Sequence, residues 1–404
     1  MPLFEGLTIG LMNEKNTTVV FDFGTGYTKA GFAGESGPRV ILKSEVLCRK
    51  SGKYVPVFEY EDEEELRHHL VDFIHKLYFR HLLVNPKDRR VVVVENVLSP
   101  SKIRNTIAKV LFRHYEVLSL LYVPLQIASL MTLGITTGLV LDLGYQEATL
   151  IPVYENVIIL NAWQSLPLGG KAIHSSLCEI LLDRGLVVGE DGKEQRLNAA
   201  VEKLPEKILE DIKVRTCFVT TMERSKRLQN NKYDRSLEPP PPPPSVSYPM
   251  SGDRIITIPG TVRELTTELL FEQDEDRLSI PCMILNSLLQ CPGDTVHKLA
   301  ENLVIIGGTA SLRGMKHRIL AELRALAASP HYSERICINS FKVHTPPAKD
   351  NYVAWLGAAI MGGTEAVTLR SLPREQYLSN DVLPDWCNLM FNMVDEGEER
   401  EKGA

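Results

Sequence analysis

The chain has 404 residues, of which 44% are hydrophobic and 24% are charged, and its formal net charge is -6. This length allows two or more hydrophobic cores, and the composition is that of an ordinary folded protein. The acidic balance gives no reason to expect a nucleic-acid binder, and no apolar run approaches the roughly 20 residues that a membrane-spanning helix needs.

The seven cysteines are scattered along the chain and include no C-x-x-C pair. Their odd number and their spacing favour unpaired thiols in a reducing cytoplasm and predict no zinc site. Residues 1–16 lack a basic region followed by an apolar stretch, so we expect no secretion signal.

The first half of the chain alternates strand and helix signals, which predicts an α/β architecture. A helix is expected to start in the acidic run Glu61–Glu65, because apolar residues follow it at helical spacing as far as Tyr78. Arg90–Val94 is rich in β-branched residues, which is typical of a strand buried on both faces. The other predicted elements are strands within Thr17–Phe32 and Arg39–Leu42 and helices at Ser101–Tyr115 and Leu125–Leu133.

The second half continues the α/β pattern around one unusual segment. Six consecutive prolines, Pro239–Pro244, can form only extended polyproline II, so 230–248 is expected to be an exposed loop. The alternative is a ligand for an SH3 or profilin-like partner. The charged tail 391–404 is expected to be disordered. The predicted elements are a hairpin at Asp142, strands near Val157–Ala162, at Ile255–Ile258 and at Leu303–Ile306, and helices at Ala172–Asp183, at Pro205–Phe218 and near Arg318–Ala327.

Two segments have the pattern of one phosphate-binding hairpin. Val19–Phe32 and Leu139–Leu150 are each an apolar strand ending in Asp-x-Gly, then a tight turn and a second strand. Glycines in such turns let backbone N–H groups close on phosphate oxygens, and the strand-end Asp is placed to hold a metal ion through water. Two copies more than a hundred residues apart indicate a clamp with one jaw on each of two similar domains. The second copy has Tyr145 and Glu147 where a phosphate site favours small or metal-binding residues.

A glycine pair forms a third candidate site. Gly307 and Gly308, with Thr309, follow a buried strand and precede a helix. Such a pair lets the backbone approach a flat or anionic ligand, and the alternative is an ordinary tight turn between strand and helix. The sequence contains no Rossmann fingerprint, no P-loop and no H-E-x-x-H motif.

Three histidines, His68, His69 and His75, fall on the helix predicted after Glu61. Carboxylates neighbour them, but no cysteine matches them in the sequence, so we expect packed or solvated roles rather than a metal site.

In this order, these motifs resemble actin and the actin-related proteins. The resemblance is carried by Lys29–Glu35 with Pro38-Arg39, Thr136–Asp142, Leu166–Gly170, Asp211–Lys213 with Cys217, Glu301–Thr309 and Val353–Gly357. It implies an actin-like (RNase H-like, duplicated) two-domain α/β fold with a central nucleotide cleft and a strongly reduced subdomain 2. The implied domains are 1–135, with a subdomain 2 remnant near 45–60, then 136–345 with the Pro-rich loop, and C-terminal helices at 346–390 that return to the first domain.

The resemblance also implies a site for ATP or ADP, with Mg2+ held through water by Asp22 and Asp142. The residues expected at the phosphates are Asp22, Gly24, Thr25, Gly26, Lys29, Asp142 and Gly144. Gly170 and Lys213 are expected beside the ribose and base, and Gly307, Gly308 and Thr309 on the far side of the nucleotide.

Several positions depart from the family pattern. A family Asn is Phe23, a metal-facing Asp is Tyr145, the acidic residue after the lysine is Val214, and the adenine-packing aromatic is Leu312. The water-orienting Gln falls at Leu125 in an ungapped alignment, with Gln126 beside it. Because hydrolysis depends on groups positioned in the transition state, we expect nucleotide binding without efficient ATPase activity.

The shortened segment near 45–60 predicts an architectural role. In actin this region carries a loop that inserts into the next subunit, and a protomer without that face cannot extend a head-to-tail filament. Phe79–Pro86, Pro124-Leu125 and Pro384–Cys387 are similar to the branch of the family at the pointed end of dynactin. The resemblance therefore implies a cytoplasmic, cytoskeletal cap with dynactin partners: actin-related protein 1, actin, the other pointed-end subunits and, indirectly, dynein. The alternatives are an active actin-like ATPase and a nuclear actin-related protein of a chromatin-remodelling complex.

Overall fold

The computed structural model describes residues 18–188, 194–197, 204–233, 240–250, 254–273, 275, 278–338 and 340–387. The chain divides into two compact units. Unit 1 comprises 1–137, 153–158 and 346–404, and unit 2 comprises 138–152 and 159–345.

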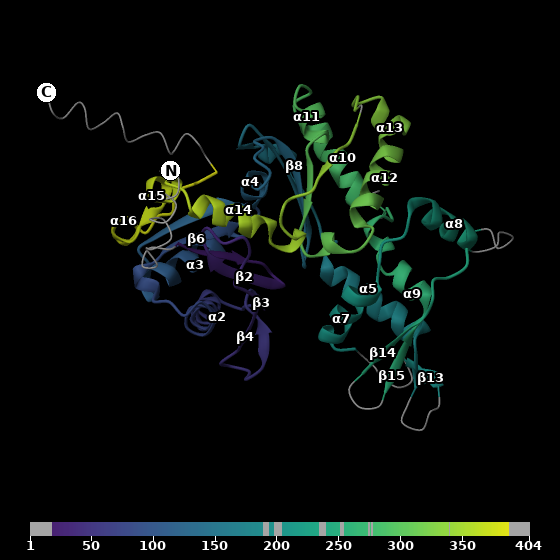
Figure 1. The fold of residues 1–404 in the computed structure, drawn as a ribbon, viewed down its shortest axis with the longest axis horizontal. Helices are drawn as coiled ribbons and strands as arrows, with labels where there is room; N and C mark the ends of the chain where they lie inside the picture. The colour runs from purple at the N-terminus through teal and green to yellow at the C-terminus, as the bar shows by residue number, and fades with distance from the viewer. Residues whose placement is uncertain are drawn as a thin grey trace, which may run out of the picture. The chain divides into compact units, whose positions relative to one another are not determined.

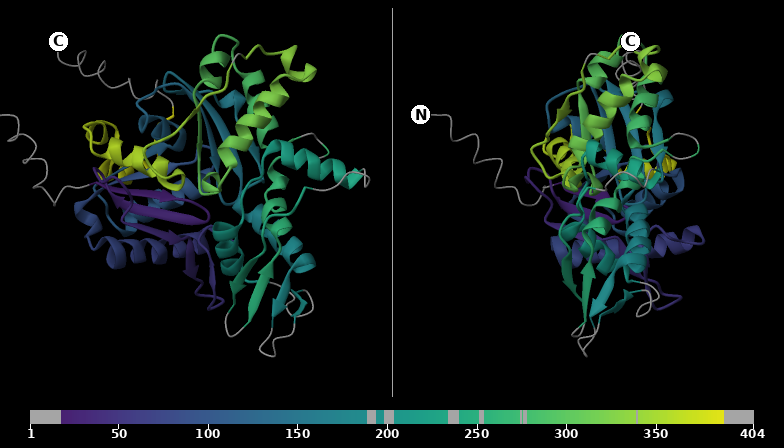
Figure 2. Two further views of the ribbon diagram at one scale, coloured as in Figure 1. Left: turned by 45° about the vertical axis from the view of Figure 1, so that its right-hand side comes forward. Right: turned by 90° about the vertical axis from the view of Figure 1, so that its right-hand side faces the viewer.

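Unit 1 contains a six-stranded sheet in the order β18-β7-β6-β1-β2-β3. Its strands are β1 Val19–Phe23, β2 Tyr27–Phe32, β3 Val40–Lys43, β6 Arg90–Glu95, β7 Ser119–Pro124 and β18 Leu372–Pro373. Its helices are α2 Glu63–Lys76, α3 Ser101–Lys109, α4 Leu125–Met131, α14 Val353–Gly362, α15 Ala366–Arg370 and α16 Arg374–Asn380. Helices α2 and α3 lie on one side of this sheet and α14 on the other (Figures 1 and 2).

The helix α14 is fixed against the first strand and against α4. The Trp355 indole is fully buried and donates a hydrogen bond to the Val20 carbonyl at 3.1 Å. A β-carbon on Gly357 would overlap the Ala128 carbonyl oxygen of α4. Glycine is therefore required at 357, because the two helices touch through their backbones.

A second sheet repeats the topology of the first. It runs β10-β9-β8-β16-β17, with β11 pairing β9. Its strands are β8 Gly138–Leu143, β9 Ala148–Tyr154, β10 Val157–Ile158, β11 Gln164–Leu166, β16 Leu303–Ile306 and β17 Val343–His344. In the first sheet β1 pairs antiparallel with β2 on one side and parallel with β6 on the other. In the second sheet β8 likewise has the next strand, β9, on one side and pairs parallel with the later strand β16 on the other. This repeat confirms the predicted duplicated α/β fold.

Unit 2 also carries a smaller sheet in the order β13-β12-β15-β14. Its strands are β12 Leu186–Val188, β13 Glu194–Arg196, β14 Val246–Pro249 and β15 Ile255–Ile258. The helices of unit 2 are α5 Gly170–Arg184, α7 Glu206–Thr216, α8 Met222–Tyr233, α9 Gly260–Leu265, α10 Ile280–Gln290, α11 Val296–Ala300, α12 Met315–Ala327 and α13 Pro330–Ser333. One core packs α10 and α12 on β8 and β16, and another packs α5 and α7 on the smaller sheet.

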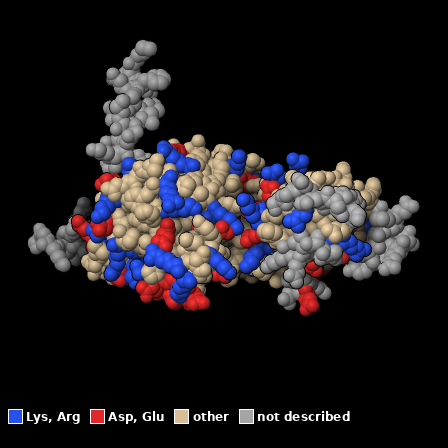
Figure 3. Space-filling view, turned by 90° about the horizontal axis from the view of Figure 1, so that it is seen from below, with Lys and Arg blue, Asp and Glu red and all other residues tan. Residues whose placement is uncertain are grey.

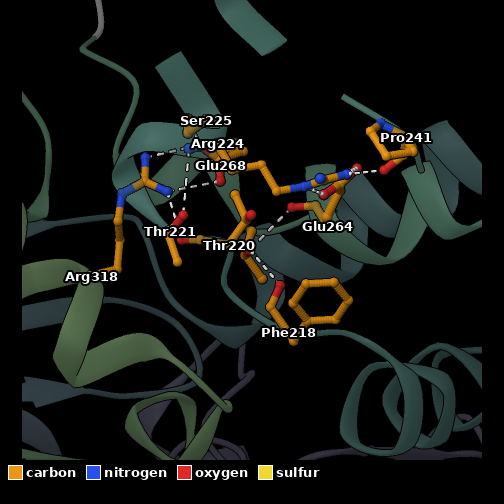
Figure 4. A network of polar contacts seen from close by, with 10 residues as sticks. Phe218, Thr220, Thr221, Arg224, Ser225, Pro241, Glu264, Glu268 and Arg318 are labelled. Carbon is orange, nitrogen blue, oxygen red and sulfur yellow. Dashed lines mark hydrogen bonds and ion pairs between the residues drawn. The ribbon is translucent and has the colours of Figure 1, made fainter. Parts of the chain in front are cut away.

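A buried polar network joins three segments of unit 2 (Figure 4). The Arg318 guanidinium on α12 makes a two-pronged ion pair with Glu268, at 3.2 and 3.1 Å. It also donates to the Thr220 carbonyl at 2.8 Å, and Ser225 donates to Glu268 at 2.5 Å. Arg318 and Glu268 are 2% and 4% exposed, so this pair is shielded from water.

The shortened segment of unit 1 forms a small hairpin rather than a separate subdomain. Strands β4 Glu45–Leu47 and β5 Tyr54–Pro56 pair only with each other among the described strands. Val46 and Val57 are buried, and β4 packs against α2. The remnant expected near 45–60 is thus a two-stranded flap on this helix.

Several predicted elements need correction. The strand expected near Val157–Ala162 ends at Ile158 and is followed by a 3-10 turn. The helix expected at Ser101–Tyr115 continues beyond Lys109 as a π-helical turn. The strand β7 was not anticipated, although Leu120–Val123 is a fully apolar run.

The Pro-rich segment is also more ordered at its edges than expected. Helix α8 extends to Tyr233, and β14 occupies the end of the predicted loop because Val246–Pro249 pairs with β15. The middle of the predicted loop, 234–239, and the predicted tail, 391–404, lie outside the described residues.

Candidate functional site

The turn between β1 and β2 brings together the candidate residues of unit 1. Asp22 and Lys29 are register partners across the hairpin, and their side chains form an ion pair at 2.9 Å. Both side chains are mostly buried, at 11% and 14% exposure, which places one compensated charge pair directly below the turn. Thr25 is exposed at the tip of the turn and Gly26 is buried.

The conformation of the turn between β1 and β2 depends on a glycine and on hydrogen bonds from Ser44. A β-carbon on Gly24 would lie 2.6 Å from the Tyr27 carbonyl oxygen, so the turn can close this tightly only with glycine there. Ser44, just after β3, donates its hydroxyl to the Gly24 carbonyl at 2.6 Å and its amide to the Gly26 carbonyl at 3.0 Å. Sequence reasoning missed Ser44, because only the folded sheet brings β3 beside the turn.

Phe23 packs on the core of unit 1 and is itself half-buried. Its ring stacks on Phe21 with the centroids 5.2 Å apart, and Phe21 in turn meets Tyr78 edge to face. The family Asn at this position has been exchanged for a packing residue, which supplies no ligand to a metal or a phosphate.

In unit 2, the candidate residues converge from four separate stretches of chain. The Gly144 carbonyl accepts the Gly170 amide at 3.0 Å and the Thr309 hydroxyl at 2.9 Å. Gly307 has φ of 98°, and a β-carbon there would lie 2.5 Å from Asp142 Oδ1. The end of β8, the start of α5 and the turn after β16 are therefore held in contact.

Lys213 completes this group from α7. A β-carbon on Gly170 would lie 3.5 Å from both Lys213 Nζ and Thr309 Oγ1. Lys213 is buried, and burial lowers the pKa of its ammonium. The charges of Glu210 and Glu206 act in the opposite direction, but burial has the larger effect on the pKa.

Tyr145 is directed toward α7 and α5. Its hydroxyl contacts the Glu206 carboxylate, and its ring meets His174 with the centroids 5.8 Å apart. His174 Nδ1 lies 3.8 Å from Glu206 Oε1. Sequence reasoning found Tyr145 but missed Glu206 and His174, since no motif links three residues so far apart in the chain.

The other departures from the family pattern differ in their surroundings. Leu312 is 9% exposed and belongs to the core of unit 2, whereas Val214 is 68% exposed on α7. Leu125 and Gln126 open α4, and both are buried. Within the described residues neither amide atom of Gln126 has a hydrogen-bond partner. This buried amide is therefore available to bind a water molecule.

Charges of both signs are mixed on the surface of the chain. Lys and Arg side chains are interspersed with Asp and Glu on the face seen in Figure 3. No helix in the described part of the chain combines the length and the apolarity needed to cross a lipid bilayer.

Comparison with known proteins confirms the predicted resemblance. A family profile described as Actin matches residues 13–381. The protein named "Actin-related protein 10" from Dictyostelium discoideum is 26% identical over 441 aligned positions, which cover 93% of this chain and 90% of that protein.

Proposed function

The chain belongs to the actin family, and we propose that it is a non-catalytic architectural subunit that caps the pointed end of the actin-like filament of dynactin. Its partners would be actin-related protein 1, actin and the other pointed-end subunits of dynactin. Through them it would support dynein-driven, microtubule-based transport in the cytoplasm. The similarity to a protein named actin-related protein 10 supports this proposal.

The hairpin β4–β5 is the observation that carries the proposal. Each strand has three residues, and the pair folds back on α2 through Val46 and Val57. Such a flap is too short to reach into a neighbouring subunit, so the protomer lacks one of the two faces of a head-to-tail interface. A subunit with only the receiving face can join a filament end but cannot be followed by another copy.

We expect the purified chain to stay in the supernatant on sedimentation at any practical concentration, and to bind one end of a preformed actin-like filament. Electron microscopy of dynactin should show a single copy at the pointed end. Copies repeated along the filament, or a copy at the opposite end, would contradict the capping role and show that the deletion only trims a surface loop.

We further propose that the chain binds ATP or ADP, with Mg2+. The residues of each unit suit a nucleotide: a tight glycine turn over a mostly buried ion pair in unit 1, and a buried lysine beside Gly170 and Thr309 in unit 2. Fewer side chains are available to hold the metal ion, because Tyr145 contacts Glu206 and Phe23 stacks on Phe21. Asp22 and Asp142 would hold Mg2+ through water.

Hydrolysis should be slow in this setting. At positions 145, 23 and 125 the chain has Tyr145, Phe23 and Leu125 in place of the family residues that would hold the metal ion or orient the attacking water. The alternative, an active ATPase, is favoured by one observation, the buried Gln126 amide without a partner among the described residues.

Protein purified with ATP and then denatured is expected to release an adenine nucleotide on chromatography, still largely as ATP after hours at room temperature. Steady phosphate release at the rate of filamentous actin would favour the ATPase alternative and assign the water-orienting role to Gln126. Folded protein that releases no nucleotide would refute the binding proposal.

A further inference from the structure

Three side chains with metal-ligand chemistry meet where the β4–β5 hairpin packs on α2. Cys48 directly follows β4, whereas Glu65 and His69 stand four residues apart on α2. One ligand atom of each lies within 4.8 Å of the others. Residues four apart share a helix face, so both α2 side chains point toward the hairpin. The sequence-based expectation that no cysteine matches these histidines therefore does not hold.

His69 presents a prepared ligand atom. Its ring is 4% exposed, and its Nδ1 lies 3.3 Å from the Val57 carbonyl oxygen. Because that oxygen can only accept, the neutral ring carries its proton on Nδ1 and its lone pair on Nε2. Nε2 is buried and has no hydrogen-bond partner within the described residues. A histidine whose first nitrogen donates to a carbonyl and whose second is open is the usual arrangement of a metal-binding imidazole.

Glu65 is oriented in a similar way. Its Oε2 accepts the Glu61 amide at 2.9 Å, which fixes the carboxylate and leaves Oε1 directed toward Cys48, 3.9 Å from Sγ. The Lys50 ammonium is 3.5 Å from Oε1, but Lys50 is 61% exposed and also approaches Glu61 and Asp62. A shared, exposed cation of this kind contributes little and can move aside.

Cys48 is held in place by the hairpin turn. Its amide donates to the Lys53 carbonyl at 2.9 Å, and its carbonyl accepts the Gly52 amide at 2.9 Å. The residue is 6% exposed. A buried thiol beside an imidazole lone pair and a carboxylate suits a borderline-soft ion.

We propose that Cys48 Sγ, His69 Nε2 and Glu65 Oε1 bind one Zn2+, with water as the fourth ligand. The Cys48 thiol releases its proton to solvent on binding, and no other bond changes. Tetrahedral zinc with these ligands needs ligand atoms about 3.5 Å apart, so the three side chains must close by about 1 Å. The ion would fasten the hairpin to α2. This goes beyond the capping role, which does not depend on a metal.

The test uses the full-length chain, freed of metal by a chelator and then titrated with Co2+ and with Zn2+. We expect one Co2+ per chain with a thiolate charge-transfer band, displaced by Zn2+. In the unmutated protein Zn2+ should protect one thiol from alkylation, and peptide mass mapping should identify it as Cys48. Absence of the band, or protection of a different cysteine, would overturn the proposal.

Variants supply the matched comparison. Cys48→Ser and His69→Gln are expected to weaken Zn2+ binding by about tenfold to a hundredfold or more. His68→Gln, on the same helix, and Cys337→Ser, at an exposed thiol, should bind as the unmutated chain does. Unchanged binding in Cys48→Ser would reject the site, and the mapping on the unmutated chain decides the question if a variant fails to fold.

Discussion

Replacing Arg318 with methionine is expected to lower the free energy of unfolding by about 3–5 kcal/mol, as measured by urea denaturation. The substitution keeps most of the side-chain volume but removes the partner of Glu268, which is 4% exposed. The hydroxyl of Ser225 cannot neutralise that carboxylate, so a charge remains in the interior. The loss of stability is large because the positive charge of Arg318 no longer offsets the cost of keeping the Glu268 carboxylate away from water.

Two comparisons identify the buried charge as the cause. Arg215, whose side chain is 69% exposed in an ion pair with Asp211, should lose less than about 1 kcal/mol on the same substitution. The double variant Arg318→Met with Glu268→Gln should be more stable than Arg318→Met alone, because the buried charge of Glu268 is removed and only the more exposed Glu322 loses an ion pair. A double variant as unstable as the single one would show that packing, not charge, is lost.

The free energy of unfolding of Arg318→Met should depend on pH through the carboxylate of Glu268. Burial already raises the pKa of Glu268 in the folded chain, and losing Arg318 raises it further. An acid with a raised folded-state pKa costs stability at pH values above that pKa and costs less once it is protonated. The deficit of Arg318→Met should therefore shrink as the pH falls through the folded-state pKa, relative to the unmutated chain.

The sequence predicted the elements whose signal is local. The strands predicted at Arg90–Val94 and Leu303–Ile306 are β6 and β16 in the structure. Apolar runs of this length are typical of parallel strands that are buried on both faces. The two Asp-x-Gly hairpins were also predicted, because the strand, the turn and the second strand follow one another directly in the sequence. The strand β7 was missed because its apolar run, Leu120–Val123, lies between two helices and carries no turn signal of its own.

What the sequence could not predict is pairing between distant residues. Glu268 and Arg318 lie 50 positions apart, and Tyr145 and Glu206 lie 61 apart. Cys48 and His69 are nearer in the chain, but a strand end and a helix face share no spacing rule that a motif search can use. Such contacts depend on tertiary packing, which local patterns do not encode.

Gly307→Ala is expected to destabilise the chain by about 2–4 kcal/mol, combining the cost of a left-handed residue with that of a clash. Gly307 has φ of 98°, and a β-carbon there would overlap the Leu143 carbonyl oxygen and lie 2.5 Å from Asp142 Oδ1. The methyl group would push the end of β8 away from β16. Nucleotide retention should fall with it, because Asp142 and Gly144 move together.

Gly308→Ala provides the matched control at the next residue. Gly308 has φ of -62°, and a β-carbon there meets nothing within 4 Å, so the fold should tolerate alanine within about 0.5 kcal/mol. If a nucleotide occupies that open space, the added methyl group should nevertheless reduce nucleotide retention. Thermal unfolding and chromatography of the released nucleotide separate the two effects. A Gly308→Ala protein that retains its nucleotide fully would show that Gly308 does not contact the nucleotide. A Gly307→Ala protein as stable as the unmutated chain would show that β8 can move to accommodate the methyl group without a loss of stability.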